Sequence, residues 1–130
     1  MRRVLLGLML FSIACVDDGL TGSSTVTGTY TLRTVNGSPL PYTVVEGPMV
    51  GTVIIDDAIT LYQGGTYVEP SHSRATPKGP VESETETGTY ALLGNSISLR
   101  SNESGLTKVT KVNGNSMTFV EPGITSVFRK

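Results

Sequence analysis

The chain of 130 residues predicts an all-β domain from Gly28 onward. Its composition changes there to Thr, Val, Ile, Tyr and Leu, which are enriched in strands. Gly, Asn or Pro interrupts the pattern about every eight to twelve residues, the spacing typical of short antiparallel strands joined by turns. No useful length of the chain repeats apolar residues at positions i, i+3, i+4 and i+7, which is the pattern of an amphipathic helix.

The first strand is predicted to begin at Gly28 and to end at the turn dipeptide Asn36-Gly37. Tyr30 and Leu32 share one of its faces. Residues 38–41, Ser-Pro-Leu-Pro, are expected to form a surface connection outside the sheet, because proline has no N–H to donate to a ladder.

The β-branched run from Val50 to Ile55 predicts a second strand. Asp56-Asp57 is interpreted as the turn that ends it, and a further strand is expected over Ile59–Tyr62. After the Gly-Gly dipeptide that follows, the next strand begins at Thr66.

Residues 69–87 are the least hydrophobic part of the predicted domain. Glu82, Glu84 and Glu86 alternate with hydroxyl residues, so a strand here would have one carboxylate face and one hydroxyl face. Neither face favours burial. We therefore expect a mobile hairpin that reaches into water and resists pairing with another chain through its charges.

The carboxy-terminal part predicts two hairpins and a last strand. The first hairpin covers residues 89–100 with its turn at Gly94-Asn95, and the second turns at Asn113-Gly114. The last strand, Ile124 to Arg129, follows the Pro122-Gly123 turn.

Alternation along these strands assigns one set of side chains to the interior. The set consists of Tyr30, Leu32, Val53, Ile55, Leu61, Tyr67, Tyr90, Leu92, Ile97, Leu99, Val109, Met117 and Phe119. These side chains are either an ordinary core, which every sheet needs, or the lining of a ligand pocket.

The amino terminus has the layout of an export signal. Arg2 and Arg3 precede an apolar run from Val4 to Ala14. This run is shorter than the about 20 apolar residues needed to span a bilayer. The sequence thus predicts a signal peptide over residues 1–14 and an exported domain behind it.

Ser12-Ile13-Ala14-Cys15 is similar to the lipobox of bacterial lipoproteins. This resemblance implies that Cys15 is acylated and becomes the mature amino terminus. Ordinary secretory cleavage at the same bond, which would leave a free thiol, is the alternative. Lipidation is favoured because a lone cysteine in an oxidising compartment has no disulfide partner within the chain.

Cleavage leaves enough chain for one domain. Residues 15–27 are rich in Gly, Ser, Thr and Asp and predict a flexible tether, and residues 28–130 form the folded domain. The chain has 10 Lys and Arg against 11 Asp and Glu, and losing Arg2 and Arg3 makes the net charge about −3. This balance argues against nucleic acid, which requires clustered positive charge.

The sequence offers little for catalysis, so we expect no enzyme, no cofactor and no metal site. His72 is the only histidine, and no neighbouring residue type positions it as a catalytic base. One histidine and one lipid-bearing cysteine cannot form a transition-metal site. Asp56 and Asp57 are adjacent and would point apart in a strand.

Two other acidic motifs have ordinary interpretations. The carboxylate face of Glu82, Glu84 and Glu86 could hold calcium weakly, but it lacks the loop spacing of a calcium motif and is interpreted as a solvated face. Residues 102–104 fit the glycosylation sequon and are interpreted as a turn.

Several strings of the chain resemble the small lipocalin-like domains of bacterial lipoproteins. They are Gly28-Thr29-Tyr30-Thr31-Leu32 with Asn36-Gly37 and Leu40-Pro41, Gly88-Thr89-Tyr90 with Gly94-Asn95-Ser96-Ile97, and Val127-Phe128-Arg129. In lipocalins proper the first strand carries Gly-x-Trp, whereas Tyr30 has the tryptophan's place here. The resemblance implies about eight antiparallel strands closed into an up-and-down barrel, which is packed solid or holds one small apolar ligand.

Two functions remain open. The first is binding of a small hydrophobic ligand in the barrel interior, with the lining residues Tyr30, Leu32, Tyr67, Tyr90, Leu92 and Phe119. The second is a structural or inhibitor-like interaction through loops, with a filled interior. A cavity lined by the tyrosines would favour the first function, and a packed barrel with an exposed apolar patch would favour the second. We expect a monomer, held by its lipid in the bacterial cell envelope and facing the periplasm or the cell surface.

Overall fold

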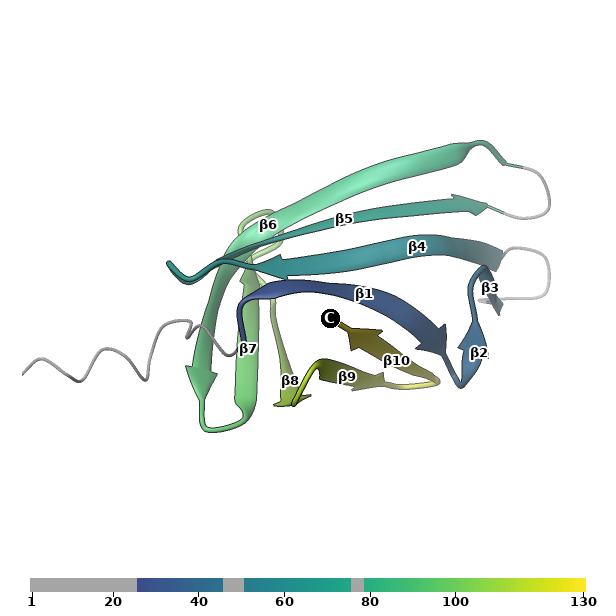
Figure 1. Cartoon of the computed structure of the whole chain (residues 1–130). Coiled ribbons are helices and arrows are strands. Elements are labelled where there is room, and N and C mark those ends of the chain that lie inside the picture. Colours follow the sequence, from purple (N-terminus) through teal and green to yellow (C-terminus); the bar gives the residue numbers. More distant parts are fainter. Residues whose placement is uncertain (1–25, 46–50, 76–78) are drawn as a thin grey trace, which may run out of the picture.

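The computed structural model describes residues 26–45, 51–75 and 79–130, and within these ranges all regular structure is antiparallel sheet (Figure 1). The strands are β1 (Gly28–Val35), β2 (Ser38–Pro39), β3 (Tyr42–Val45), β4 (Gly51–Leu61), β5 (Thr66–Ala75), β6 (Val81–Leu93), β7 (Ser96–Ser101), β8 (Thr107–Asn113), β9 (Ser116–Glu121) and β10 (Ile124–Arg129).

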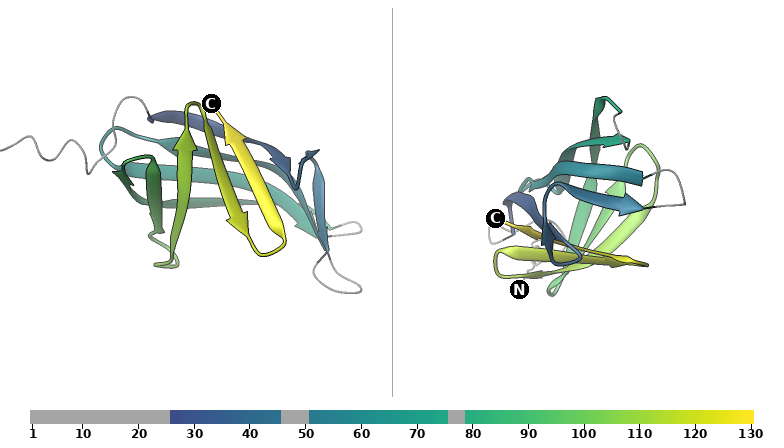
Figure 2. Two further views of the ribbon diagram at one scale, coloured as in Figure 1. Left: turned by 90° about the horizontal axis from the view of Figure 1, so that it is seen from below. Right: turned by 90° about the vertical axis from the view of Figure 1, so that its right-hand side faces the viewer.

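Within the described residues, β1 and β4 to β10 form a closed barrel. Strands β4 to β10 pair in chain order, β10 pairs with β1, and β1 pairs with β4. Thr31 of β1 pairs with Arg129 of β10 on one side and with Ala58 of β4 on the other, which closes the barrel. Figure 2 shows β8, β9 and β10 lying across the interior from β4 and β5. The predicted all-β, up-and-down barrel of about eight strands is confirmed.

The first predicted turn is also confirmed. Asn36 and Gly37 have φ values of 52° and 81°, and a two-residue hairpin turn of type I′ needs positive φ at both positions. The Asn36 side chain accepts a hydrogen bond from the Thr125 N–H at 2.8 Å and donates to the Gly123 carbonyl at 3.1 Å. It thereby joins this turn to the turn between β9 and β10.

The prediction that residues 38–41 lie outside the sheet is wrong for the first two. Ser38 and Pro39 form β2, which pairs with Val35 and Thr34 at the end of β1. In the strand order, β2 is a terminal strand. An edge strand tolerates proline because a missing N–H on the outer side leaves no ladder partner unsatisfied.

The Asp56-Asp57 pair is not a turn, which corrects the prediction of two strands here. Strand β4 continues through both residues, and its register with β5 shifts between Ile54 and Asp56. Such a bulge adds a residue and changes which side chains face inward. Ile55, predicted inside, is only half-buried, and Ile59, absent from the predicted interior, is completely buried.

Val109 was predicted to face inward, but its side chain is 68% exposed. Its neighbours Thr110 and Val112 are the buried residues of β8. The Thr110 hydroxyl donates to the Thr118 carbonyl, so this polar side chain is buried without losing a hydrogen bond. The prediction that the apolar Val109 faces inward is therefore wrong, because the face of β8 with Thr110 and Val112 is the interior one.

Of the other predicted interior residues, all except Val53 and Leu92 belong to the buried core, and Leu92 is half-buried against it. The prediction is wrong for Val53, which is buried but is not part of this core, whereas its neighbour Ile54 packs against the core. Before the bulge, β4 therefore turns its even-numbered residues inward. Val35, Ile59, Val112 and Phe128 complete the same core.

The core also includes Val26, which was predicted to belong to the tether. Its side chain is 7% exposed, and its carbonyl accepts a hydrogen bond of 2.7 Å from the Tyr30 hydroxyl. The packed domain therefore includes Val26. The predicted signal peptide, Cys15 and the remainder of the tether lie outside the described residues.

Residues 69–75 of β5 and 81–87 of β6 pair as the two arms of the predicted hairpin, and they extend the barrel wall. Strand β5 pairs with β4 and with β6 along most of its length, and it accommodates Pro70. The expectation that neither face is buried fails at the base, where the Glu69 side chain is only 12% exposed and Glu86 is half-buried. Glu82 and Glu84 are exposed.

Candidate functional site: the charged mouth of the barrel

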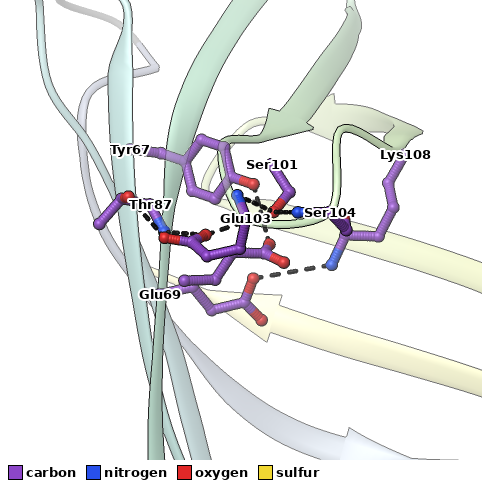
Figure 3. Close-up of polar contacts among 8 residues, drawn as sticks. Tyr67, Glu69, Thr87, Ser101, Glu103, Ser104 and Lys108 are labelled. Atoms are coloured by element: carbon purple, nitrogen blue, oxygen red, sulfur yellow. Dashed lines mark hydrogen bonds and ion pairs between the residues drawn. The ribbon is translucent and has the colours of Figure 1, made fainter.

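The two ends of the barrel interior differ in chemistry. One end is packed with apolar side chains, among which Ile97 and Met117 have no exposed surface. The other end carries charged side chains on β4, β5, β6 and β8 and on the loop between β7 and β8. We call this end the mouth and define it by Asp57, Glu69, Glu86, Glu103 and Lys108. Figure 3 shows Glu69, Glu103 and Lys108 of this group.

Strand alternation explains why these charges face inward. Asp57 lies two residues before the buried Ile59, and Glu69 lies two residues after the buried Tyr67. Lys108 likewise lies two residues before Thr110. Because side chains two apart share a face, each strand extends the interior face from core residues into charged ones.

Two adjacent cavities occupy the mouth. A cavity of about 230 Å³ is lined by Glu69, Ser71, Glu84, Thr85, Glu86, Glu103 and Lys108. A cavity of about 120 Å³ is lined by Asp57, Glu69, Lys108, Phe119, Glu121, Ser126 and Phe128. Glu69 and Lys108 line both cavities. Each has room for several waters or a small polar group, since one water occupies about 30 Å³ of liquid volume.

The Lys108 ammonium is held between a carboxylate and an aromatic ring. Its Nζ atom is 3.6 Å from Glu69 Oε1 and 5.3 Å from the centroid of the Phe119 ring. An ammonium group is attracted to the face of an aromatic ring at this distance. The mouth therefore already contains the contacts that recognise an alkylammonium ion.

Asp57 is the most strongly perturbed acid of the mouth. Its Oδ1 atom is buried and receives no hydrogen bond from the described residues. Burial first, then the charge of Glu69 and a hydrogen bond shared with that carboxyl group, raise the pKa of Asp57 to about 8. Asp57 is thus largely protonated at neutral pH, and it can donate its own proton to Glu69.

Glu86 and Glu103 are held by hydrogen bonds from neighbouring strands. The Tyr67 hydroxyl donates to Glu86 Oε1 at 2.8 Å, and burial, followed by this hydrogen bond, raises the pKa of Tyr67. Glu103 receives the Thr87 N–H at 3.1 Å and the Thr87 hydroxyl at 3.0 Å. The backbone hydrogen bond from Thr87 is the first cause that lowers the pKa of Glu103, so this side chain stays anionic. Residues 102–104 form the predicted turn.

The six predicted lining residues are inside the barrel, but most belong to its packed part. The hydroxyl groups of Tyr30 and Tyr90 donate to the Val26 and Tyr62 carbonyls. None of the three predicted tyrosines lines any of five cavities found among the described residues. Phe119 lines the smaller mouth cavity. Leu92 lines a cavity of about 340 Å³ beside Val26 and Val112, at the end of the barrel opposite the mouth, and a second cavity on β6, β7 and β8. Their role as ligand contacts stays a prediction.

Sequence reasoning missed Asp57, Glu69 and Lys108 as site residues. For Asp57 and Glu69 the signal was the period of two, which places them on the same face as Ile59 and Tyr67. Lys108 had no such signal, because the prediction that Val109 faces inward places Lys108 outside. They were overlooked because charged residues are almost never buried unless paired, so their types indicated solvent.

His72 is on the outer face, where its Nδ1 atom is 2.6 Å from Asp56 Oδ1. Both side chains are about half exposed. Among the described residues, no three His, Cys, Asp or Glu side chains are grouped so that they could hold a metal ion. The same residues contain no helix with the length and hydropathy to cross a membrane.

Comparison with solved structures finds a likeness to a lipocalin-like protein from Bacteroides uniformis ATCC 8492. The two chains are 21% identical with a TM-score of 0.49, and the match covers 82% of this chain and 99% of the other. No family model matches the chain. No curated protein matches it either. The barrel described above rests on the strand pairing of this chain itself.

Proposed function

We propose that this chain is an exported, lipid-anchored, non-catalytic binding protein of the bacterial cell envelope, which recognises positively charged groups at the mouth. One observation carries the proposal: the chain's own Lys108 ammonium is held there by Glu69 and the Phe119 ring. An ammonium or guanidinium group of a ligand can use the same kinds of contact.

The charge balance of the mouth supports recognition of a further cation. Glu84, Glu86, Glu103 and Glu121 line its cavities or the adjoining surface, and Lys108 is the one cation in the walls of the two mouth cavities. A concave site with an excess of one charge concentrates its field and attracts ligands of the opposite sign. Binding of this kind weakens as salt is added.

A small hydrophobic ligand within the barrel is the other candidate from the sequence. Its predicted site is filled by the packed side chains of Tyr30, Tyr67 and Tyr90, which are at most 5% exposed. Outside the barrel, Leu93 and Val109 are 76% and 68% exposed and line a shallow apolar cavity on β6, β7 and β8. A filled interior with apolar surface outside favours an interaction function over storage of an apolar molecule.

Spermidine is the probe that tests recognition at the mouth, with the full chain purified in detergent. Isothermal titration calorimetry is expected to detect salt-sensitive binding that Glu69→Gln weakens about tenfold, which corresponds to about 1.4 kcal/mol. Asp56→Asn makes the same change in charge on the outer face and is expected to leave the affinity unchanged. Equal affinities for the two variants would refute the mouth as the site. Palmitate binding that neither variant alters would instead support the hydrophobic candidate.

Cys15→Ser tests the anchor. Cells grown with a fatty-acid analogue are expected to label the wild-type chain and not the serine variant, because serine has no thiol to acylate. Mass spectrometry of the purified chain should place the lipid on a mature amino-terminal cysteine. Label that persists in the serine variant would exclude Cys15 as its site.

A further inference from the structure

Strand β6 has an edge that its neighbours use only in part. In its ladder with β5, Tyr90 directs its N–H to the Gly65 carbonyl, and alternation turns the N–H and C=O groups of the even-numbered residues of β6 toward β5. The odd-numbered residues therefore direct theirs to the opposite side. There, Thr89, Ala91 and Leu93 face β7.

Beyond the end of β7, one more residue of this edge has a partner. The Thr87 carbonyl accepts the Asn102 N–H at 2.8 Å, and the Thr87 N–H donates to Glu103. Val81, Ser83 and Thr85 come next toward the tip of the hairpin. Their outward N–H and C=O groups have no partner among the described residues. Three residues thus offer six backbone groups for pairing.

Charge lies on one face of this edge. Glu82 and Glu84 point to the same side of β6 as Glu86, which is the side of the mouth, and Glu84 lines the larger mouth cavity. Both are exposed. Figure 1 shows this half of β6 extending beyond the end of β7. A strand added here would place alternate side chains beside these carboxylates and over the cavity.

We propose that the β6 edge over residues 81–85 pairs with an extended segment of a partner protein that carries basic side chains at alternate positions. The backbone groups of the edge supply hydrogen bonds, and Glu82, Glu84 and the mouth select the charge. This inference rests on the proposed function for its charge recognition and adds to it the extended backbone of the ligand.

Two other occupants fit the edge less well. A second copy paired antiparallel through the same edge would set Glu82 opposite Glu84 of that copy, and like charges in direct opposition destabilise a strand pair. The chain's own amino-terminal segment enters the domain at Val26, beside Gly94 and Gly114 in the turns at the other end of the barrel. A basic partner segment has neither disadvantage.

Two pentapeptides of one composition separate strand pairing from simple charge attraction. Lys-Thr-Lys-Thr-Lys places its charges on one face of a strand, whereas Thr-Lys-Lys-Lys-Thr does not. Both have blocked ends, and both are titrated into the full chain in detergent. The alternating peptide is expected to bind at least about tenfold more tightly, or about 1.4 kcal/mol. Methylating the backbone nitrogens of this peptide should remove its advantage in affinity, because the N–H groups that pair with the edge are lost. The charges of the lysine side chains are unchanged.

A proline at Ser83 tests the edge itself. Ser83→Pro removes an outward N–H, and the ladder to β5 does not use that group. Ser83→Ala keeps the N–H and is the matched control. The proline variant should bind the alternating peptide at least about tenfold more weakly, while both variants bind spermidine as the wild type does. Circular dichroism of both variants checks that the barrel is intact.

Each outcome has a distinct meaning. Equal affinity for the two peptides, or for the peptide in the proline and alanine variants, would overturn the strand pairing and leave the proposed function standing. Loss of binding of both spermidine and the peptides would overturn the proposed function as well. Analytical ultracentrifugation compares the oligomeric state of the wild type and of Ser83→Pro. A wild-type dimer that the proline variant does not form would show that a second copy binds the edge, and this result would also overturn the inference.

Discussion

Replacing Gly88 with alanine is expected to destabilise the barrel by about 3 kcal/mol or more, because the added methyl group has no space. A Cβ atom at Gly88 would lie 2.0 Å from the Arg100 carbonyl oxygen and 2.6 Å from Cε1 of Tyr67. The first contact is with the backbone of β7, and the second is with a completely packed ring, so neither neighbour can move away easily. Glycine at this position lets the Tyr67 ring lie directly over β6.

Gly64→Ala is the matched control for this prediction. No atom lies within 4 Å of a Cβ built at Gly64, and its φ lies outside the left-handed region. Alanine should therefore change the free energy of unfolding little at this position. It can raise it slightly, because alanine lowers the conformational entropy of the unfolded chain. Urea unfolding followed by circular dichroism measures both variants. A Gly88→Ala free energy of unfolding within about 0.5 kcal/mol of the wild type would contradict the packing described at β6 and β7.

Asp57→Asn is expected to stabilise the protein at alkaline pH and to flatten its stability profile. Burial raises the pKa of Asp57 to about 8 in the folded state, whereas the ordinary pKa of a free aspartic acid side chain is 3.8. Between these values the folded state binds more protons than the unfolded state. Its stability therefore falls by up to about 1.4 kcal/mol for each pH unit as the pH rises. Asparagine resembles the protonated acid and removes this dependence.

The difference between wild type and Asp57→Asn is therefore smallest near pH 4 and grows toward pH 8, reaching about 2–5 kcal/mol. Guanidinium unfolding at a series of pH values measures it. Parallel profiles for wild type and Asp57→Asn would mean that Asp57 ionises normally in the folded protein.

Much of the barrel could be predicted from local patterns. The turn at Asn36-Gly37 and the alternation around Tyr30 and Tyr90 have strong signals, because both follow from backbone geometry within a few residues. The errors at Asp56-Asp57 and at Val109 have a different origin. A bulge in β4 and a hydrogen-bonded, buried Thr110 depend on neighbouring strands, which no local pattern contains.

The site was less accessible to sequence reasoning than the fold. Prediction placed the ligand among the aromatic residues, because apolar side chains line most binding pockets. Whether such side chains leave space is decided by packing in three dimensions, and Tyr30, Tyr67 and Tyr90 fill the interior. Glu69 and Lys108 are 39 residues apart in the chain, and they meet only because β5 and β8 face each other across the barrel.

The barrel interior has a packed apolar end and a charged mouth, and we propose that the mouth binds cations. Nuclear magnetic resonance of the uniformly labelled chain during titration with spermidine tests it most directly. We expect shifts to concentrate at Glu69, Glu86 and Lys108, with the methyl groups of Ile97 and Met117 unchanged. Shifts centred on those methyl groups, or on Leu93 and Val109 outside the barrel, would contradict the claim.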